Sequence, residues 1–267
     1  MKNKKLQPTV NKKKPPPRNK PKLAIVKPEP RAKPTKANRE RPLTLITQGN
    51  TKLGPKLIWG FNIPALSTCP GHSEVCSSVC YALSGHYTFT SVRDKYDQNL
   101  RRTKEDSFVD DMVDEITRAR AQVFRPHSSG DMYSVTYIQK WINIATRCPD
   151  TRFFIYTRSW RIPRMLTRLC VLANLPNVQL WFSIDSSTGI PTTKPRNVRY
   201  AYLLMNDSEE ALIPPEADLI FRNEVGRIAK KLGGVQVCTY ENGIPIKTGK
   251  ITCDRCSICW MPPRSRS

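Results

Sequence analysis

The chain has 267 residues, of which 39% are hydrophobic, enough to build an ordinary buried core, so a chain disordered throughout is excluded. Its 44 Lys and Arg against 22 Asp and Glu give a net charge of +22, which indicates an anionic partner such as nucleic acid or a nucleotide. No apolar run approaches the roughly 18–20 residues of a membrane helix, and the N-terminus lacks the apolar centre of a signal peptide. We therefore expect a cytoplasmic protein with no membrane contact.

The composition predicts three parts. Residues 1–41 hold 15 basic and two acidic residues interspersed with Pro, which removes backbone donors while like charges repel, so we expect a disordered tail. This tail is either a solubilising linker or an electrostatic attachment to DNA or RNA phosphates. Residues 42–237 read as an α/β barrel-like domain, and residues 238–267 as a cysteine-rich metal-binding segment.

Helices and strands alternate along the middle of the chain. A loop dense in cysteine covers 64–81, and helices follow from an N-cap at Ser107, from an N-cap at Ser134 and over 164–173. The predicted strands are 122–124, 152–156, 178–184, 200–205, 219–221 and 235–239. Because such alternation is typical of parallel βαβ units, the sequence predicts an α/β fold, with a complete or partial (β/α) barrel.

The first cysteine group has the spacing C-x6-C-x3-C at Cys69, Cys76 and Cys80. A reducing cytoplasm disfavours disulfides, and nine cysteines would leave one unpaired, so metal ligation is the leading explanation. A [4Fe-4S] cluster held by three cysteines leaves one iron open for a substrate or cofactor. His72 and His86 lie nearby in the sequence, so a zinc site of three cysteines and one histidine is the alternative.

The second cysteine group has the spacing C-x2-C-x2-C at Cys253, Cys256 and Cys259. If Cys238 folds back, it completes a site of four thiolates. Such a site can hold an auxiliary [4Fe-4S] cluster or a structural zinc ion, and the spacing does not decide between them.

Polar residues follow three successive predicted strands, at the edge where ligands gather in α/β sheets. We predict catalytic roles for His127, Asp131, Arg158 and Asp185. We predict cofactor binding by Ser129, Gly130, Thr157 and Ser183. His127 has three possible roles: a general acid or base, a ligand contact, or a hydrogen-bond partner of Asp131.

Several motifs together resemble the gene product 88 domain family of phage and plasmid proteins. They are GNTKLGPKLIWGFNIPALSTCPG, HSSGDMYS, FIYTRSW, FSIDSS and the final C-x2-C-x2-C-W, and they span residues 43–260. The resemblance implies an origin in a phage or mobile element, and it implies no particular reaction.

A three-cysteine loop ahead of a βα repeat, followed by a cysteine-rich C-terminus, is also similar to radical S-adenosylmethionine enzymes that carry an auxiliary cluster. That similarity implies a [4Fe-4S] cluster whose open iron binds S-adenosylmethionine inside a barrel. The spacing differs from the usual C-x3-C-x2-C of those enzymes. A glycine-glycine-acidic motif is absent unless Gly130 and Asp131 take its place.

The sequence therefore supports two hypotheses. The first is a phage-type iron-sulfur enzyme that uses the three-cysteine cluster for radical or reductive chemistry on a nucleotide or nucleic acid. The alternative is a non-enzymatic nucleic-acid-binding protein with two structural zinc sites, in which the basic tail supplies the affinity.

Overall fold

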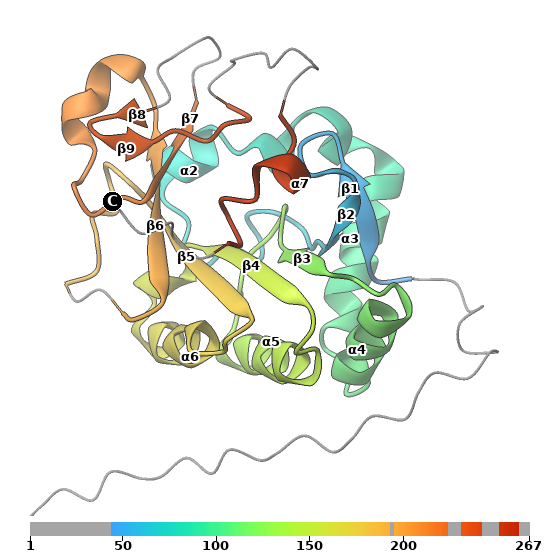
Figure 1. Cartoon of the computed structure of the whole chain (residues 1–267). Helices are drawn as coiled ribbons and strands as arrows, with labels where there is room; N and C mark the ends of the chain where they lie inside the picture. Colours follow the sequence, from blue (N-terminus) through green and yellow to red (C-terminus); the bar gives the residue numbers. More distant parts are fainter. Residues whose placement is uncertain (1–43, 193–194, 224–230, 242–250, 262–267) are drawn as a thin grey trace, which may run out of the picture. The chain divides into compact units, whose positions relative to one another are not determined.

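A seven-stranded, mostly parallel sheet is the centre of the fold in the computed structural model, which describes residues 44–192, 195–223, 231–241 and 251–261 (Figure 1). Its strands lie side by side in chain order: β1 Thr47–Asn50, β2 Gly54–Phe61, β3 Val123–Pro126, β4 Arg152–Thr157, β5 Val178–Asp185, β6 Val198–Leu204 and β7 Leu219–Arg222. β1 is antiparallel to β2, and every later neighbour is parallel. The α/β prediction is confirmed, whereas the predicted tail, residues 1–41, lies outside the described residues.

The described strands form an open sheet. β1 pairs with β2 and β7 pairs with β6, and no described pairing joins β7 to β1, so a closed barrel is not observed. The last predicted strand is shorter than expected: β9 Val235–Gln236 pairs with β8 Lys231–Leu232 in a separate small sheet. Val237 then bridges to Ile220 of β7, so the chain returns to the edge of the main sheet.

Three helices cover one face of the sheet: α4 Phe108–Arg118, α5 Val135–Arg147 and α6 Pro163–Ala173 (Figure 1). All three were predicted. Ser134 caps α5, because its hydroxyl accepts a hydrogen bond from the Tyr137 N–H at 3.1 Å. Ser107 is the N-cap residue of α4, as predicted, but its hydroxyl donates to Asp111 and makes no capping hydrogen bond.

The remaining helical segments are short or lie outside this layer. They are α2 Glu74–Ser78, η1 Tyr81–Leu83, η2 Gly85–Thr88, α3 Thr90–Arg102, η3 Ser159–Arg161, η4 Asp207–Leu212 and α7 Cys253–Cys256. No helix in the part of the chain that the structure describes is both long and apolar enough to cross a membrane.

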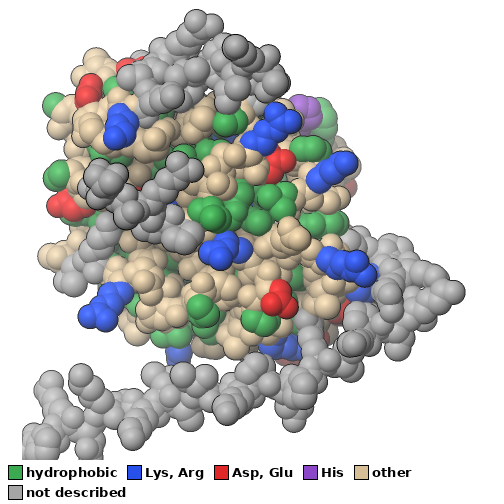
Figure 2. Space-filling view, in the orientation of Figure 1, with side chains coloured by type: hydrophobic (Ala, Val, Ile, Leu, Met, Phe, Trp, Pro, Cys, Tyr) green, Lys and Arg blue, Asp and Glu red, His purple; other side chains and the backbone are tan. Residues whose placement is uncertain are grey.

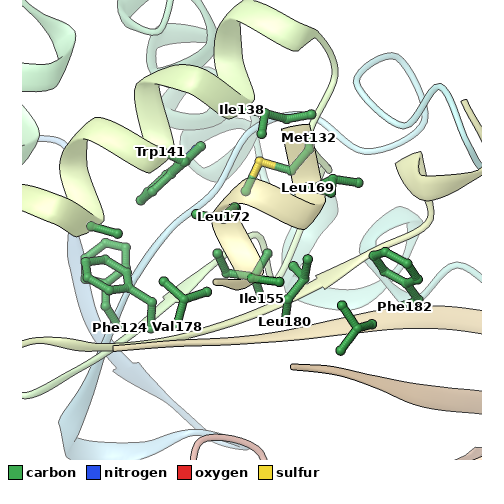
Figure 3. Close-up of a cluster of buried hydrophobic side chains, with 14 of the residues drawn as sticks. Phe124, Met132, Ile138, Trp141, Ile155, Leu169, Leu172, Val178, Leu180 and Phe182 are labelled. Carbon is green, nitrogen blue, oxygen red and sulfur yellow. The ribbon is translucent and has the colours of Figure 1, made fainter. Parts of the chain in front are cut away.

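The main core lies between the sheet and the helices (Figure 3). Phe124, Leu180 and Phe182 point from the strands toward Trp141 and Leu169 of the helices, and all five are fully buried. Strands covered on both faces carry nearly continuous apolar runs, which explains the sequence VQLWFSID of β5.

The opposite face of the sheet is covered by the C-terminal segment 251–261 (Figure 1). Trp260 packs on Phe154 with ring centres 5.2 Å apart, and the Trp181 indole donates to the Cys259 carbonyl at 2.8 Å. Arg199 donates to two further carbonyls of the segment, at 3.0 and 2.8 Å. The fold thereby places the second cysteine group on the face away from the helices.

Candidate functional site

The first cysteine loop is joined by hydrogen bonds to residues at the carboxyl ends of β4 and β5. Ser73 caps α2 by accepting a hydrogen bond from the Cys76 N–H at 3.0 Å, and its hydroxyl donates to Asp185 Oδ2 at 2.6 Å. The same oxygen accepts a bond from Arg158 Nη1 at 2.5 Å. Cys76 is therefore held beside two of the residues that the sequence predicts to be catalytic.

Gly71 brings the loop close to the sheet. A Cβ atom at this position would lie 2.1 Å from the Arg158 carbonyl oxygen, so only glycine fits this approach. Arg161 then donates from Nη1 to the carbonyl oxygens of Gly71 and His72, at 3.1 and 2.9 Å. Close backbone contact and these hydrogen bonds fix the loop immediately before α2.

The three thiols of the loop influence one another. Burial raises the pKa of Cys69 to about 12, and Asp131, Cys76 and Cys80 add to this rise. Burial also raises the pKa of Cys76, while the Arg158 cation acts in the opposite direction. The metal-free thiols of Cys69 and Cys76 are therefore protonated at neutral pH, and a bound metal would displace those protons.

The two buried carboxylates of the site are satisfied by the protein itself. Asp131 accepts bonds from the backbone N–H groups of Met132 at 2.6 Å and Arg158 at 2.9 Å, while burial raises its pKa. Asp185 Oδ1 accepts bonds from the Ser187 N–H and hydroxyl, at 2.9 and 2.7 Å. Burial acts to raise the pKa of Asp185, but its hydrogen bonds and the Arg158 charge lower it. Asp131 therefore holds the backbone of Arg158, whereas Asp185 holds the Arg158 side chain and Ser73 of the cysteine loop.

The Arg158 side chain has more N–H donors than its bond to Asp185 uses. Its guanidinium is buried beside Asp185 and the Cys76 thiol. Among the described residues, Asp185 is the carboxylate to which it donates, and this hydrogen bond uses Nη1 alone. Arginine has five N–H donors in a planar fork. The remaining donors can bind an anionic or carbonyl group placed next to Cys76.

The predicted cofactor-binding residues have internal partners. Ser129 donates to the Ile63 carbonyl at 2.9 Å, and Gly130 has φ of +83° with its Cα against Ile63, where a Cβ would lie 2.3 Å from Cγ1. The Thr157 hydroxyl accepts a bond from the backbone N–H two residues later, at 3.0 Å. The Ser183 carbonyl accepts a bond from a tryptophan indole at 3.0 Å. These residues shape the strand ends, and cofactor binding by their side chains stays a prediction.

His127 lies in the helix layer. Its Nε2 is 2.8 Å from the Tyr137 hydroxyl, and its ring packs against Tyr137 and Trp141 with centres 5.6 and 5.8 Å apart. Burial, with a smaller effect of Arg125, lowers the pKa of His127 to about 3, so the ring is neutral at physiological pH. The structure does not bring His127 to the cysteine loop, and a hydrogen bond to Asp131 is not observed. Its catalytic role stays a prediction.

The cysteines of the second group lie near one another. Cys253 and Cys259 belong to one apolar cluster, and the Cys256 thiol lies 3.4 Å from a threonine hydroxyl that follows Cys238. Burial raises the pKa of Cys238 to about 12, with Cys259 among the further causes. Burial likewise raises the pKa of Cys259 to about 11, with Cys253 and Cys256 adding to it. Cys238 therefore lies near the C-terminal run, and metal binding by these four thiols stays a prediction.

Neither cysteine group forms a ready-made site for a single ion. Within the described ranges, no three His, Cys, Asp or Glu side chains are arranged to hold one metal ion. Zinc draws its thiolates to about 2.3 Å, whereas a four-iron cluster is larger and holds its thiolates farther apart. His72 Nδ1 lies 2.7 Å from the Cys69 carbonyl oxygen, and the His86 ring packs on Phe89. Zinc ligation by either histidine stays a prediction.

Sequence reasoning missed several residues of the site. Ser73 carried a signal, because a serine ahead of a short helix is a standard N-cap. Gly71 carried none, since its role depends on a contact with the backbone of Arg158, 87 positions later. Lys52, which lies near the second cysteine group, also had no local signal.

Comparison with known proteins places the chain in a family. The family model described as gene product 88 matches residues 36–262. The chain belongs to the gene product 88 family. Among its relatives are two proteins named Gene 88 protein, from Mycobacterium phage L5 and Mycobacterium phage D29, which are 28% and 26% identical over 129 residues. Each match covers 44% of this chain and 52% of the relative, so this gene product 88 chain matches about half the length of each relative. No solved structure matches it.

Proposed function

We propose that this chain is an iron-sulfur enzyme that uses a [4Fe-4S] centre held by Cys69, Cys76 and Cys80. The observation that carries the proposal is the position of the cysteine loop at the carboxyl ends of parallel strands, with Cys76 beside Arg158 and Asp185. Ligands of α/β sheets gather at this edge. Half-buried thiols in a purely structural role would not need a cation beside them.

The proposed chemistry is radical, in the manner of S-adenosylmethionine enzymes, or simply reductive. A cluster with one open iron supplies an electron to a molecule bound at that iron. Arg158 would orient the bound molecule with its free N–H donors, and Asp185 keeps the guanidinium in place. Ser73 fixes the backbone of Cys76, so the loop is preorganised before the ligand arrives.

The proposed substrate is a nucleotide or nucleic acid, acted on in the cytoplasm of the host cell. The net charge of +22 supports an anionic partner, and Arg158 offers a buried cation for a phosphate or carboxylate. Cys238, Cys253, Cys256 and Cys259 would hold a second centre, either an auxiliary [4Fe-4S] cluster or a structural zinc ion. This second site requires the four thiols to close around the metal from the wider arrangement described above.

Replacing one ligand tests the proposal. Cys76→Ala, purified anaerobically, is expected to lose about four irons per chain and part of the visible absorption. Cys170→Ala is the matched control, because Cys170 lies half-buried on α6, and its iron content should equal that of the unmodified chain. Equal iron in Cys76→Ala and Cys170→Ala would overturn the assignment.

A second measurement tests the cofactor. The reduced, iron-loaded chain is incubated with S-adenosylmethionine, and its cleavage is followed by chromatography, with Cys76→Ala as the blank. Cleavage by the unmodified chain alone supports the radical version of the proposal. No cleavage, with iron bound, leaves the reductive version. Zinc in place of iron would favour the nucleic-acid-binding alternative.

A further inference from the structure

Large apolar side chains are exposed directly after the first cysteine loop. Tyr81 and Phe89 are 53% and 57% exposed, and Leu83 lies exposed between them in the sequence. The other exposed side chains of this kind in the described ranges occur singly, at later positions of the chain. Single exposed apolar residues are ordinary, whereas a group of them is typical of a binding surface.

The two exposed rings are held in place by neighbouring rings. The ring centre of Tyr81 lies 5.6 Å from that of Tyr87, which lies 6.3 Å from that of Tyr96 on α3. Phe89 is the N-cap residue of α3, and its ring centre lies 5.3 Å from that of His86. Because such rings are already fixed, a flat ligand can stack on them at a small cost in conformational entropy.

Tyr81 joins this surface to the candidate site. It follows Cys80 directly, and its hydroxyl donates to the Ser128 carbonyl oxygen at 2.5 Å. Three positions after Ser128, Asp131 accepts a hydrogen bond from the Arg158 N–H at 2.9 Å. A ligand stacked on the Tyr81 ring therefore lies beside the cysteine loop.

The charge on this side of α3 favours an anionic ligand. Arg93 is exposed and lies about one helical turn from both Phe89 and Tyr96. Asp94 and Asp97 each follow one position later, so they are turned away from this side by about 100° around the helix. Figure 2 shows Lys and Arg side chains spread among hydrophobic ones on the face drawn, in keeping with the net charge of +22. Exposed rings with a cation beside them suit the bases and phosphates of an unpaired strand.

We propose that Tyr81 and Phe89 form a base-stacking platform for single-stranded DNA, with Arg93 at its phosphates. Two separate exposed rings can take successive bases of a strand, whereas a free nucleotide is bound in one enclosed pocket. The hydroxyls of Ser84 and Thr88, between the two rings in the sequence, donate to carbonyl oxygens of their own turns. They are therefore not set aside for the ribose 2′-hydroxyl that distinguishes RNA. The inference rests on the proposed function, whose substrate it specifies as an unpaired strand.

Binding of the full chain to a fluorescent oligothymidylate of about 12 nucleotides tests the platform. The reference probe is a base-free strand with the same number of phosphates, because electrostatic attraction is equal for both strands. The ratio of the two affinities therefore reports the contribution of the bases.

Three variants locate that contribution. Tyr81→Leu combined with Phe89→Leu removes both rings and keeps apolar side chains. Tyr81→Phe keeps the ring and removes the hydroxyl. Leu212→Ala is the matched control, because Leu212 lies at the end of η4 and is 53% exposed, like Tyr81. Far-UV circular dichroism checks that each variant folds.

The parent is expected to bind the oligothymidylate about 25-fold or more tightly than the base-free strand, since each stacked base contributes about five-fold or more. The double Leu variant should lower this ratio to a few-fold at most, whereas Tyr81→Phe and Leu212→Ala should keep it. A parent ratio near one, or an equal ratio in the parent and the double Leu variant, would overturn the inference. So would tighter binding of an oligouridylate or of a duplex.

Two further results separate this inference from its rivals. A parent that is a dimer and a double Leu variant that is a monomer would overturn it, because the rings would then bind a second copy of the chain. The binding assay needs no metal. Iron bound without base-dependent binding would therefore overturn the platform alone, and base-dependent binding by a chain without iron would overturn the proposed cluster alone.

Discussion

Replacing Asp185 by alanine is expected to destabilise the protein strongly, because this carboxylate joins the cysteine loop to the sheet. Its Oδ2 accepts bonds from the Ser73 hydroxyl at 2.6 Å and from Arg158 at 2.5 Å. Its Oδ1 accepts bonds from the residues of the following turn, Ser187 and Thr188. The side chain of Asp185 is fully buried and that of Arg158 is 8% exposed.

The size of the effect follows from the unpaired arginine. Removing one partner of a buried ion pair costs about 3–5 kcal/mol, since the other charge stays buried without compensation. A domain of this size is stable by about 5–15 kcal/mol, and each kcal/mol shifts Tm by about 2–4 °C. Asp185→Ala should therefore lower Tm by roughly 6–20 °C.

Urea and thermal unfolding followed by circular dichroism measure this loss. The matched control is Asp110→Ala, because Asp110 pairs with Arg147 at 2.6 Å on the surface, with side chains 71% and 40% exposed. Such surface pairs contribute about 0–1 kcal/mol. Equal destabilisation by the two substitutions would refute the view that Asp185 is a buried anchor.

Two further predictions concern the loop and the helix layer. Gly71→Ala should destabilise the chain by about 1–3 kcal/mol and reduce its iron content, because the new Cβ collides with the Arg158 carbonyl; unchanged iron and melting would contradict this. The lowered pKa of His127, about 3, should make the free energy of unfolding fall as the pH drops from about 6.5 toward 3, since only the unfolded chain binds the proton in that range. His127→Phe should flatten this part of the pH profile measured by urea unfolding, and an unchanged slope would show that another group is responsible.

The sequence predicted the elements whose pattern is local. Helix α5 had an N-cap at Ser134 and an apolar stripe, and β5 had an unbroken apolar run, so both were recognisable without tertiary information. The first parallel strand, β2, was missed because its sequence GPKLIWGF contains Gly and Pro and does not alternate. Closure of the sheet could not be predicted, since it depends on how the edge strands pair and not on any single segment.

In the candidate site, too, only the residues with a local sequence signal could be predicted. The strand-end rule located Arg158 and Asp185, and these two do meet the cysteine loop. It failed to separate them from His127, because the left-handed backbone of His127, with φ of +63°, places its ring in the helix layer.

Metal analysis of the anaerobically purified chain distinguishes an iron-sulfur protein from a zinc protein. Iron, sulfide and zinc are determined per chain, with an absorption spectrum before and after dithionite. We expect iron and sulfide in equal amounts, about four or about eight of each, and a visible band that bleaches on reduction. About two zinc ions, no sulfide and no visible band would contradict it.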